Sequence, residues 1–123
     1  MSHFTRIRTQ LRDIETVRHA LEDLGYQVEE GDVRGFMRQR AQADIVVRMG
    51  GDYDIGFQKV GDTITLVADF WGLRIDREAF LQQVTQRYAY ITVLDQAQAQ
   101  GFQVVTQETQ QDGSLRLVMQ RWG

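Results

Sequence analysis

The acidic residue best placed for chemistry is Asp69, which interrupts an otherwise apolar segment two residues before Trp71. If that segment is a strand, side-chain alternation places Asp69 on the opposite face from its apolar neighbours. These neighbours are Ile64, Leu66 and Ala68. Two interpretations remain open: Asp69 pairs with an arginine of a neighbouring strand, such as Arg48, or it anchors a ligand beside Trp71. No other residue is nominated as the partner acid that a catalytic base needs.

Two aromatic residues give further binding candidates. Arg87 and Tyr90 lie three residues apart in a segment expected to be helical, so they share one face of that helix. Their stacking either stiffens the helix surface or forms a recognition patch. Trp122, one residue from the end of the sequence, either clamps the last strand or anchors an interface.

The sequence gives no pattern for nucleophilic or metal-assisted catalysis. It has no Cys, and Ser2 and Ser114 lie in terminal or turn positions without a Gly-x-Ser-x-Gly elbow. The glycines lack P-loop and dinucleotide spacing. Of the two histidines, His19 falls on an expected helix, whereas His3 has only scattered carboxylates as possible co-ligands. We therefore expect no catalytic residue, no cofactor and no metal, and retain His3 as a candidate binding residue.

The composition indicates one folded, acidic domain spanning residues 1–123. The chain has 42% hydrophobic and 25% charged residues, as ordinary globular domains do. Its net charge of −3 argues against non-specific nucleic-acid binding. Lys59 is the only lysine among 14 basic residues, so any cationic recognition relies on arginine. No segment approaches the roughly 20 apolar residues that span a bilayer, so we expect no membrane insertion and a cytoplasmic location.

Two helices must position these residues. Asp13 is a suitable N-cap for the first helix, which Gly25 ends. Its apolar residues fall on one face: Ile14, Val17, Leu21 and Leu24. Asp76 caps a longer helix that runs to about Gln100.

The remaining segments predict strands. We expect one strand within 4–11, one or two short strands within 28–40, and a three-strand meander across 43–70. A hairpin around the Asp112-Gly113 turn closes the chain. The predicted order is β-α-β-β-β-β-β-α-β-β. It indicates an α+β fold with an antiparallel sheet and two helices packed on one face, the other face being open to solvent or to a partner.

Several segments, taken together in order, resemble the hypothetical chloroplast reading frame thirty-five family of cyanobacteria and algal plastids. The segments are Met1-Ser2-His3-Phe4, Tyr53-Asp54-Ile55-Gly56-Phe57, Leu66-Val67-Ala68-Asp69, Gln86-Arg87-Tyr88-Ala89-Tyr90, Gly101-Phe102 and Leu117-Val118-Met119-Gln120-Arg121-Trp122. The resemblance spans nearly the whole chain. It implies a location in the cyanobacterial cytoplasm or the plastid stroma, and it brings no reaction, cofactor or catalytic residue.

Three functions remain as hypotheses. The first is a non-enzymatic accessory protein that contacts a protein partner or a second copy of itself. The second is an RNA-binding module whose open sheet face stacks bases and uses arginines such as Arg6, Arg8, Arg48 and Arg116. The acidic charge disfavours it. The third is a small-molecule binder or enzyme with a pocket between sheet and helices, near Asp69 and Trp71.

Overall fold

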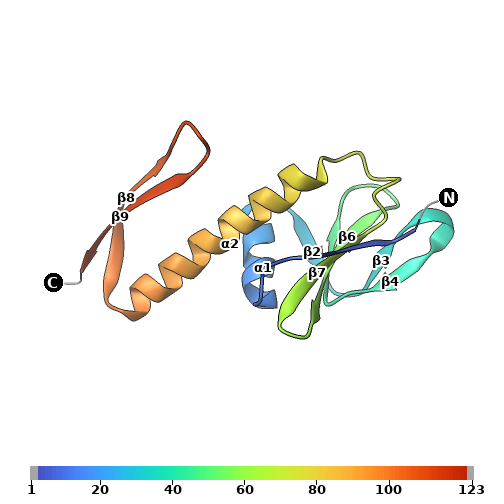
Figure 1. Ribbon diagram of the computed structural model, residues 1–123, viewed down its shortest axis with the longest axis horizontal. Coiled ribbons are helices and arrows are strands. Elements are labelled where there is room, and N and C mark those ends of the chain that lie inside the picture. The colour runs from blue at the N-terminus through green and yellow to red at the C-terminus, as the bar shows by residue number, and fades with distance from the viewer. Residues whose placement is uncertain (1–2, 122–123) are drawn as a thin grey trace.

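The computed structural model describes residues 3–121, which form an α+β fold around a five-stranded antiparallel sheet (Figure 1). Helices α1 (Ile14–Asp23) and α2 (Arg77–Ala99) pack on one face of this sheet. The strands, in spatial order, are β1 (Thr5–Arg8), β7 (Thr63–Ala68), β6 (Asp54–Val60), β5 (Ile45–Arg48) and β2 (Gln27–Glu29). The predicted α+β class, with both helices on one face, is confirmed. No helix in the described part of the chain is long and apolar enough to cross a membrane.

Helix α1 begins and ends where its capping residues predict. The Asp13 carboxylate accepts hydrogen bonds from the backbone N–H groups of Glu15 and Thr16, at 3.0 and 3.1 Å. Gly25 follows the helix with a φ of 92°, a left-handed conformation that glycine adopts without strain. The face between these caps buries Val17 and Leu21 against the sheet.

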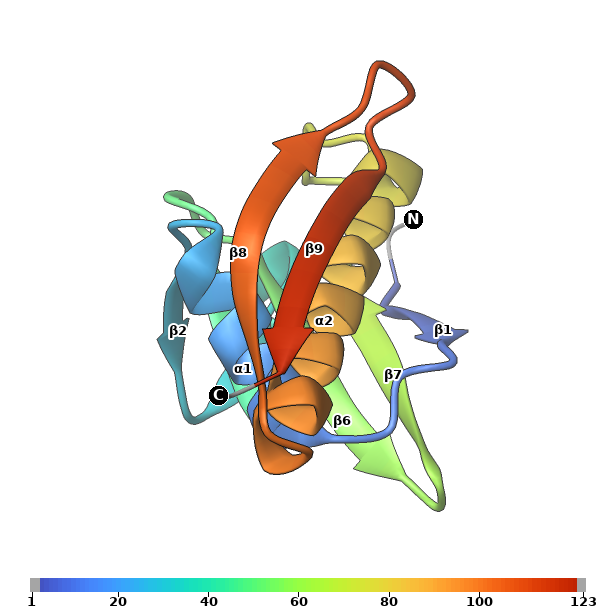
Figure 2. The same ribbon diagram turned by 90° about the vertical axis from the view of Figure 1, so that its left-hand side faces the viewer.

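Helix α2 serves two parts of the structure. Its first half buries Phe80 and Val84 in the core under the sheet, while Tyr88 accepts hydrogen bonds from the backbone N–H groups just before α1. Its second half extends past the sheet, and the closing hairpin turns back to run along the helix (Figures 1 and 2). The hairpin strands are β8 (Phe102–Thr109) and β9 (Leu115–Arg121), joined through the predicted turn. They form a two-stranded sheet of their own.

The second face of the main sheet is covered by the chain itself, so the expectation of an open face is wrong. Strands β3 (Asp32–Arg34) and β4 (Arg40–Gln42) form a hairpin, closed by the short 3-10 turn Phe36–Arg38. Val33 and Ala41 of this hairpin pack on Val46 and Val67 of the sheet. The chain therefore has six strands between its helices, where the sequence pattern indicated five.

The hairpin approaches the sheet most closely at Gly56 in β6. A Cβ atom built there would lie 2.2 Å from a methyl carbon of Val33 and 2.9 Å from the Cβ of Ala43. Any side chain at position 56 would therefore push the β3–β4 hairpin away from the sheet.

We predict that Gly56→Ala lowers the free energy of unfolding by about 1–3 kcal/mol, because the added methyl overpacks this contact. Gly51→Ala is the matched control: its Cβ would meet no atom within 4 Å, and we expect a change within about 0.5 kcal/mol. Urea denaturation followed by circular dichroism measures both. Equal stability of the two variants would contradict the packing of the hairpin on β6.

Candidate functional site

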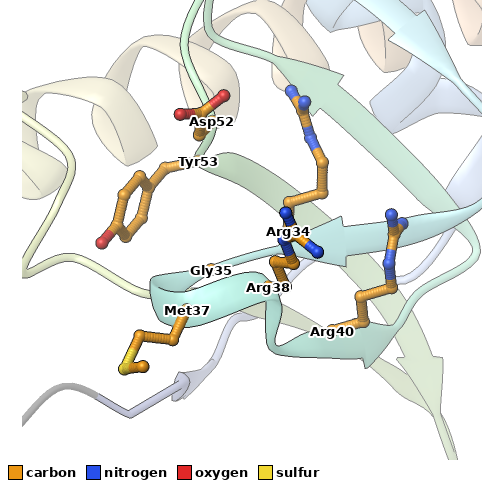
Figure 3. A pocket seen from close by; sticks show the side chains of 7 residues that line it. All are labelled: Arg34, Gly35, Met37, Arg38, Arg40, Asp52 and Tyr53. Carbon is orange, nitrogen blue, oxygen red and sulfur yellow. The ribbon is translucent and has the colours of Figure 1, made fainter.

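A pocket of about 790 Å³ lies between the tip of the β3–β4 hairpin and the loop that joins β5 to β6. It is on the side of the sheet away from the helices, not between sheet and helices as the small-molecule hypothesis placed it. The residues that line it are Arg34, Gly35, Met37, Arg38, Arg40, Asp52 and Tyr53. The arginine side chains extend on the side of the hairpin where Asp52 and Tyr53 lie, whereas Met37 points away from its tip (Figure 3).

The floor of the site is a buried charge network centred on Asp54, whose side chain is fully buried. Its carboxylate accepts hydrogen bonds from the backbone and side chain of Arg34, at 2.8–2.9 Å, and from Arg48 at 2.7 Å. Arg48 also pairs with Glu29. Burial alone would raise the pKa of Asp54. The hydrogen bonds from Arg34 and the charge of Arg48 outweigh it, so the pKa lies below its ordinary value of 3.8.

Two further arginines of the pocket have no acidic partner among residues 3–121. Arg40 lies directly opposite Arg34 in the hairpin, and Arg38 lies two residues earlier in the turn. Asp54 neutralises Arg34, but no salt bridge within residues 3–121 reaches Arg38 or Arg40. Like charges directly opposite one another destabilise an antiparallel pair. The hairpin therefore keeps an excess of positive charge that its own fold does not use.

The turn that carries Arg38 is strained and tightly held. Met37 and Arg38 have φ values of 51° and 63°, a left-handed conformation that is uncommon for residues with a side chain. The backbone of Gly35 and Gln39 closes the turn with a hydrogen bond of 2.9 Å. The buried carboxylate of Asp69 accepts a second one from the N–H of Phe36, at 3.0 Å. These contacts fix the direction in which Arg38 leaves the backbone.

An apolar rim borders the charged pocket. Met37 and Trp71 are 79% and 70% exposed, and the Trp71 ring meets Phe36 edge-on with centroids 5.3 Å apart. The Tyr53 ring lies so close to Gly72 that a Cβ atom there would be 2.1 Å from it. Burial raises the pKa of the Tyr53 hydroxyl, and the charges of Asp69 and Asp52 raise it further. At neutral pH this hydroxyl is therefore protonated and able to donate a hydrogen bond.

The structure brings three of the residues singled out from the sequence to this region. Asp69 holds the turn, and the backbone N–H of Trp71 donates to the same carboxylate at 3.2 Å. Of the two interpretations of Asp69, the ion pair is not found with Arg48, which pairs with Asp54 and Glu29 instead. The two side chains lie at different ends of the β3–β4 hairpin. Asp69 contacts the turn at Phe36, whereas Arg48 contacts Asp32 at the base.

The other candidates lie elsewhere. Arg87 stacks on Tyr90 with its guanidinium carbon 4.8 Å from the ring centre, and the Tyr90 hydroxyl donates to Gln107 at 2.8 Å. This pair helps hold β8 on α2. His3 is exposed near the start of β1, and Trp122 lies outside the described residues.

Sequence reasoning missed the arginines of the pocket and the central role of Asp54. A usable signal was present in the spacing of Arg34, Arg38 and Arg40 around a glycine, in a segment without any acidic residue. The described residues contain no group of three or more His, Cys, Asp or Glu side chains arranged to hold a metal ion.

Fold and site together define an α+β protein that presents an arginine-lined pocket on a hairpin packed across its sheet. The chain belongs to the family described as protein of unknown function (DUF1257), whose model matches residues 20–118. It is 39% identical to a protein of Guillardia theta named uncharacterized protein ycf35, over 99% of this chain and 98% of that one. The proteins of that name from Pyropia yezoensis and Cyanophora paradoxa are 35% and 36% identical over the same shares. The resemblance seen in the sequence is thus confirmed, and no solved structure matches.

We predict that Asp54→Asn lowers the free energy of unfolding by about 2–4 kcal/mol at pH 7, because Arg34 and Arg48 lose a charged partner. In the folded protein the pKa of Asp54 lies below 3.8. The stability that the ionised carboxylate contributes is therefore fully present above about pH 5, and it is lost as the pH falls through the pKa of the folded state. The two proteins therefore converge in stability at acid pH. Denaturant titrations from pH 2 to 7 test this.

The control is Asp62→Asn, at an exposed turn position, which we expect to change stability by less than about 0.5 kcal/mol. A stability difference between Asp54→Asn and the natural chain that stays constant down to pH 2 would contradict the charge network.

Proposed function

We propose that this chain is a non-enzymatic binding protein that recognises a doubly charged oxyanion, a phosphate or a clustered carboxylate group, in the arginine-lined pocket. The observation that carries the proposal is the excess charge of Arg38 and Arg40 at a pocket where Arg34 is already neutralised. The chain as a whole is acidic, with a net charge of −3, so this is a local reversal of sign.

The residue types suit such a group. Guanidinium groups form paired hydrogen bonds with phosphate and carboxylate oxygens, and these charge-assisted bonds are stronger than neutral ones. The protonated Tyr53 hydroxyl adds a neutral donor at the same pocket. Asp52, on the opposite lip, repels a second anionic group and favours a ligand whose charge is concentrated at one end.

The strained turn supports a binding role over a structural one. A left-handed conformation at a residue with a side chain costs of order 1–3 kcal/mol and persists only where surrounding contacts impose it. Here Asp69 and Gly35 impose it on Met37 and Arg38. Arg38 and the exposed Met37 both line the pocket, so an anionic group and an apolar part of one ligand can be bound side by side.

This arrangement also suits an accessory protein whose ligand is an anionic group on another protein. The exposed Met37 and Trp71 would then contact the apolar surface beside that group. The relatives from algae and from Cyanophora support action in a plastid stroma or a cyanobacterial cytoplasm.

The RNA-binding alternative relied on an open sheet face for base stacking. The sheet face proposed for base stacking is the one that Val33 and Ala41 cover, and Arg116 lies on the separate β8–β9 hairpin. Arg6 and Arg8 remain exposed on the edge strand β1, and together with the arginine pocket they offer no groove of aromatic side chains like the one on which such modules stack bases.

We predict that Arg38→Gln and Arg40→Gln each weaken binding of pyrophosphate about 10-fold or more, since each removes a charge-assisted hydrogen bond worth about 1.5–3 kcal/mol. Arg12→Gln, an exposed arginine beside the start of α1, is the matched control and should leave affinity unchanged. Isothermal titration calorimetry at low salt measures all three. Citrate titrated in parallel separates phosphate from carboxylate preference.

Binding of neither anion to the natural chain would refute the proposed function. Binding that Arg12→Gln weakens as much as Arg38→Gln would show a diffuse charge effect, and would refute it too. A short single-stranded RNA that binds more tightly than pyrophosphate would favour the alternative.

A further inference from the structure

The β8–β9 hairpin lacks the support that two-stranded sheets need. It pairs with no other strand among residues 3–121 and packs mainly against α2 (Figure 2). Two side-chain hydrogen bonds hold it there, from Tyr90 to Gln107 and from Gln86 to the carbonyl of Gly113. An isolated hairpin is marginally stable in water, and a third strand or a covered face is required for firm structure.

The two outer edges of this hairpin differ. Strand β8 has a bulge, since Val104 pairs with Met119 and Thr106 with Val118, leaving Val105 without a cross-strand partner. A bulge bends a strand and blunts its edge against further pairing. Strand β9 has no such interruption within Leu115–Arg121. It also contains no proline and no lysine, the residues that commonly protect an edge.

Strand β9 carries apolar side chains on both of its faces. Leu115, Leu117 and Met119 turn toward α2 and are only half-buried, while Val118 faces outward and is 39% exposed. An open groove of about 280 Å³ lies between α2 and β9, lined by Val93, Leu115 and Leu117 among others. The hairpin therefore leaves apolar surface uncovered at the same edge that is open for pairing.

The charge of the hairpin favours a second copy of this chain as the partner. The segment 102–121 contains two acidic residues, Glu108 and Asp112, and two arginines, Arg116 and Arg121, so its net charge is zero. The rest of the chain therefore carries the whole net charge of −3. Two copies that meet through this segment join neutral surfaces and keep the acidic parts apart.

We propose that β9 pairs in antiparallel fashion with β9 of a second copy, around a two-fold axis at Val118. The two hairpins then form one four-stranded sheet. In this register Leu117 lies opposite Met119 of the second copy and Arg116 lies opposite Gln120, so no like charges face each other. Each interior pair is apolar or polar on both sides, as a self-complementary two-fold contact requires.

Val118 is the residue that tests this arrangement, because the axis places it opposite itself. Val118→Lys brings two ammonium groups together and Val118→Glu brings two carboxylates together, so each variant alone is expected to be monomeric. An equimolar mixture of the two variants is expected to dimerise again, because Lys then lies opposite Glu. The measurement is mass by light scattering after size exclusion at about 10–200 μM, with circular dichroism to verify folding.

Val60→Lys is the matched control, since Val60 is 54% exposed at the end of β6 and distant from the hairpin; it should remain dimeric. A natural chain that is monomeric across the concentration range overturns the proposal. A Val118→Lys chain that stays dimeric also overturns it, by placing the contact on another surface. Failure of the mixed variants to dimerise overturns the two-fold register. Pyrophosphate binding by the Val118 variants is expected to be unchanged, which separates this test from that of the pocket.

Discussion

The Asp54 carboxylate joins the two parts of the structure on which the candidate site depends. It lies on β6, fully buried, and accepts four hydrogen bonds: three from Arg34 on β3 and one from Arg48 on β5. A buried carboxylate is tolerated only when its oxygens are satisfied in this way, so the sheet and the hairpin must be in register for either to be stable. The position of Arg34 then fixes its cross-strand neighbour Arg40. The buried Asp54 carboxylate thus fixes where the arginines of the pocket lie.

The apolar contacts of the β3–β4 hairpin also require it to lie in one position on the sheet. Val33 reaches the sheet only because Gly56 has no side chain, and Gly35 is likewise required because a Cβ there would lie 2.8 Å from the Phe4 ring. Asp69 then fixes the turn at the far end of the hairpin. Because the buried carboxylates of Asp54 and Asp69 hold the backbone at Arg34 and Phe36, the strain in the turn that follows is held in place by the fold and not by the turn itself.

Local features of this chain could be predicted from the sequence, and long-range ones could not. Asp13, Gly25 and Asp76 mark helix ends through hydrogen bonds within a few residues, and the Asp112-Gly113 turn closes its own hairpin. Alternation also placed Asp69, the residue after β7, on the correct side of the sheet, opposite Leu66 and Ala68. Its partner was missed because the N–H of Phe36 lies 33 residues away and no sequence pattern specifies that contact.

The covered second face did leave a trace in the sequence. Residues 45–47 and 66–68 are continuous apolar runs, and a strand that is apolar on both sides needs cover on both sides. The period-2 pattern of β6 suggested a single buried face, yet β6 holds Gly56 and Asp54 where the hairpin approaches. The short strands of that hairpin gave too weak a pattern to identify the cover.

The β3–β4 hairpin, which lines the pocket, and the β8–β9 hairpin lie at opposite ends of the molecule (Figure 1). Helix α2, about 35 Å long at 1.5 Å per residue, extends between the central sheet and the hairpin. Pairing through β9 would therefore leave both pockets at the outer ends of the dimer, too far apart for one small ligand to bridge. Two weak oxyanion contacts on one extended or repetitive partner would act together, and the second contact would form at a high effective concentration. The same geometry gives a small anion no such gain, so dimerisation would select partners that carry several anionic groups over free anions of the same chemistry.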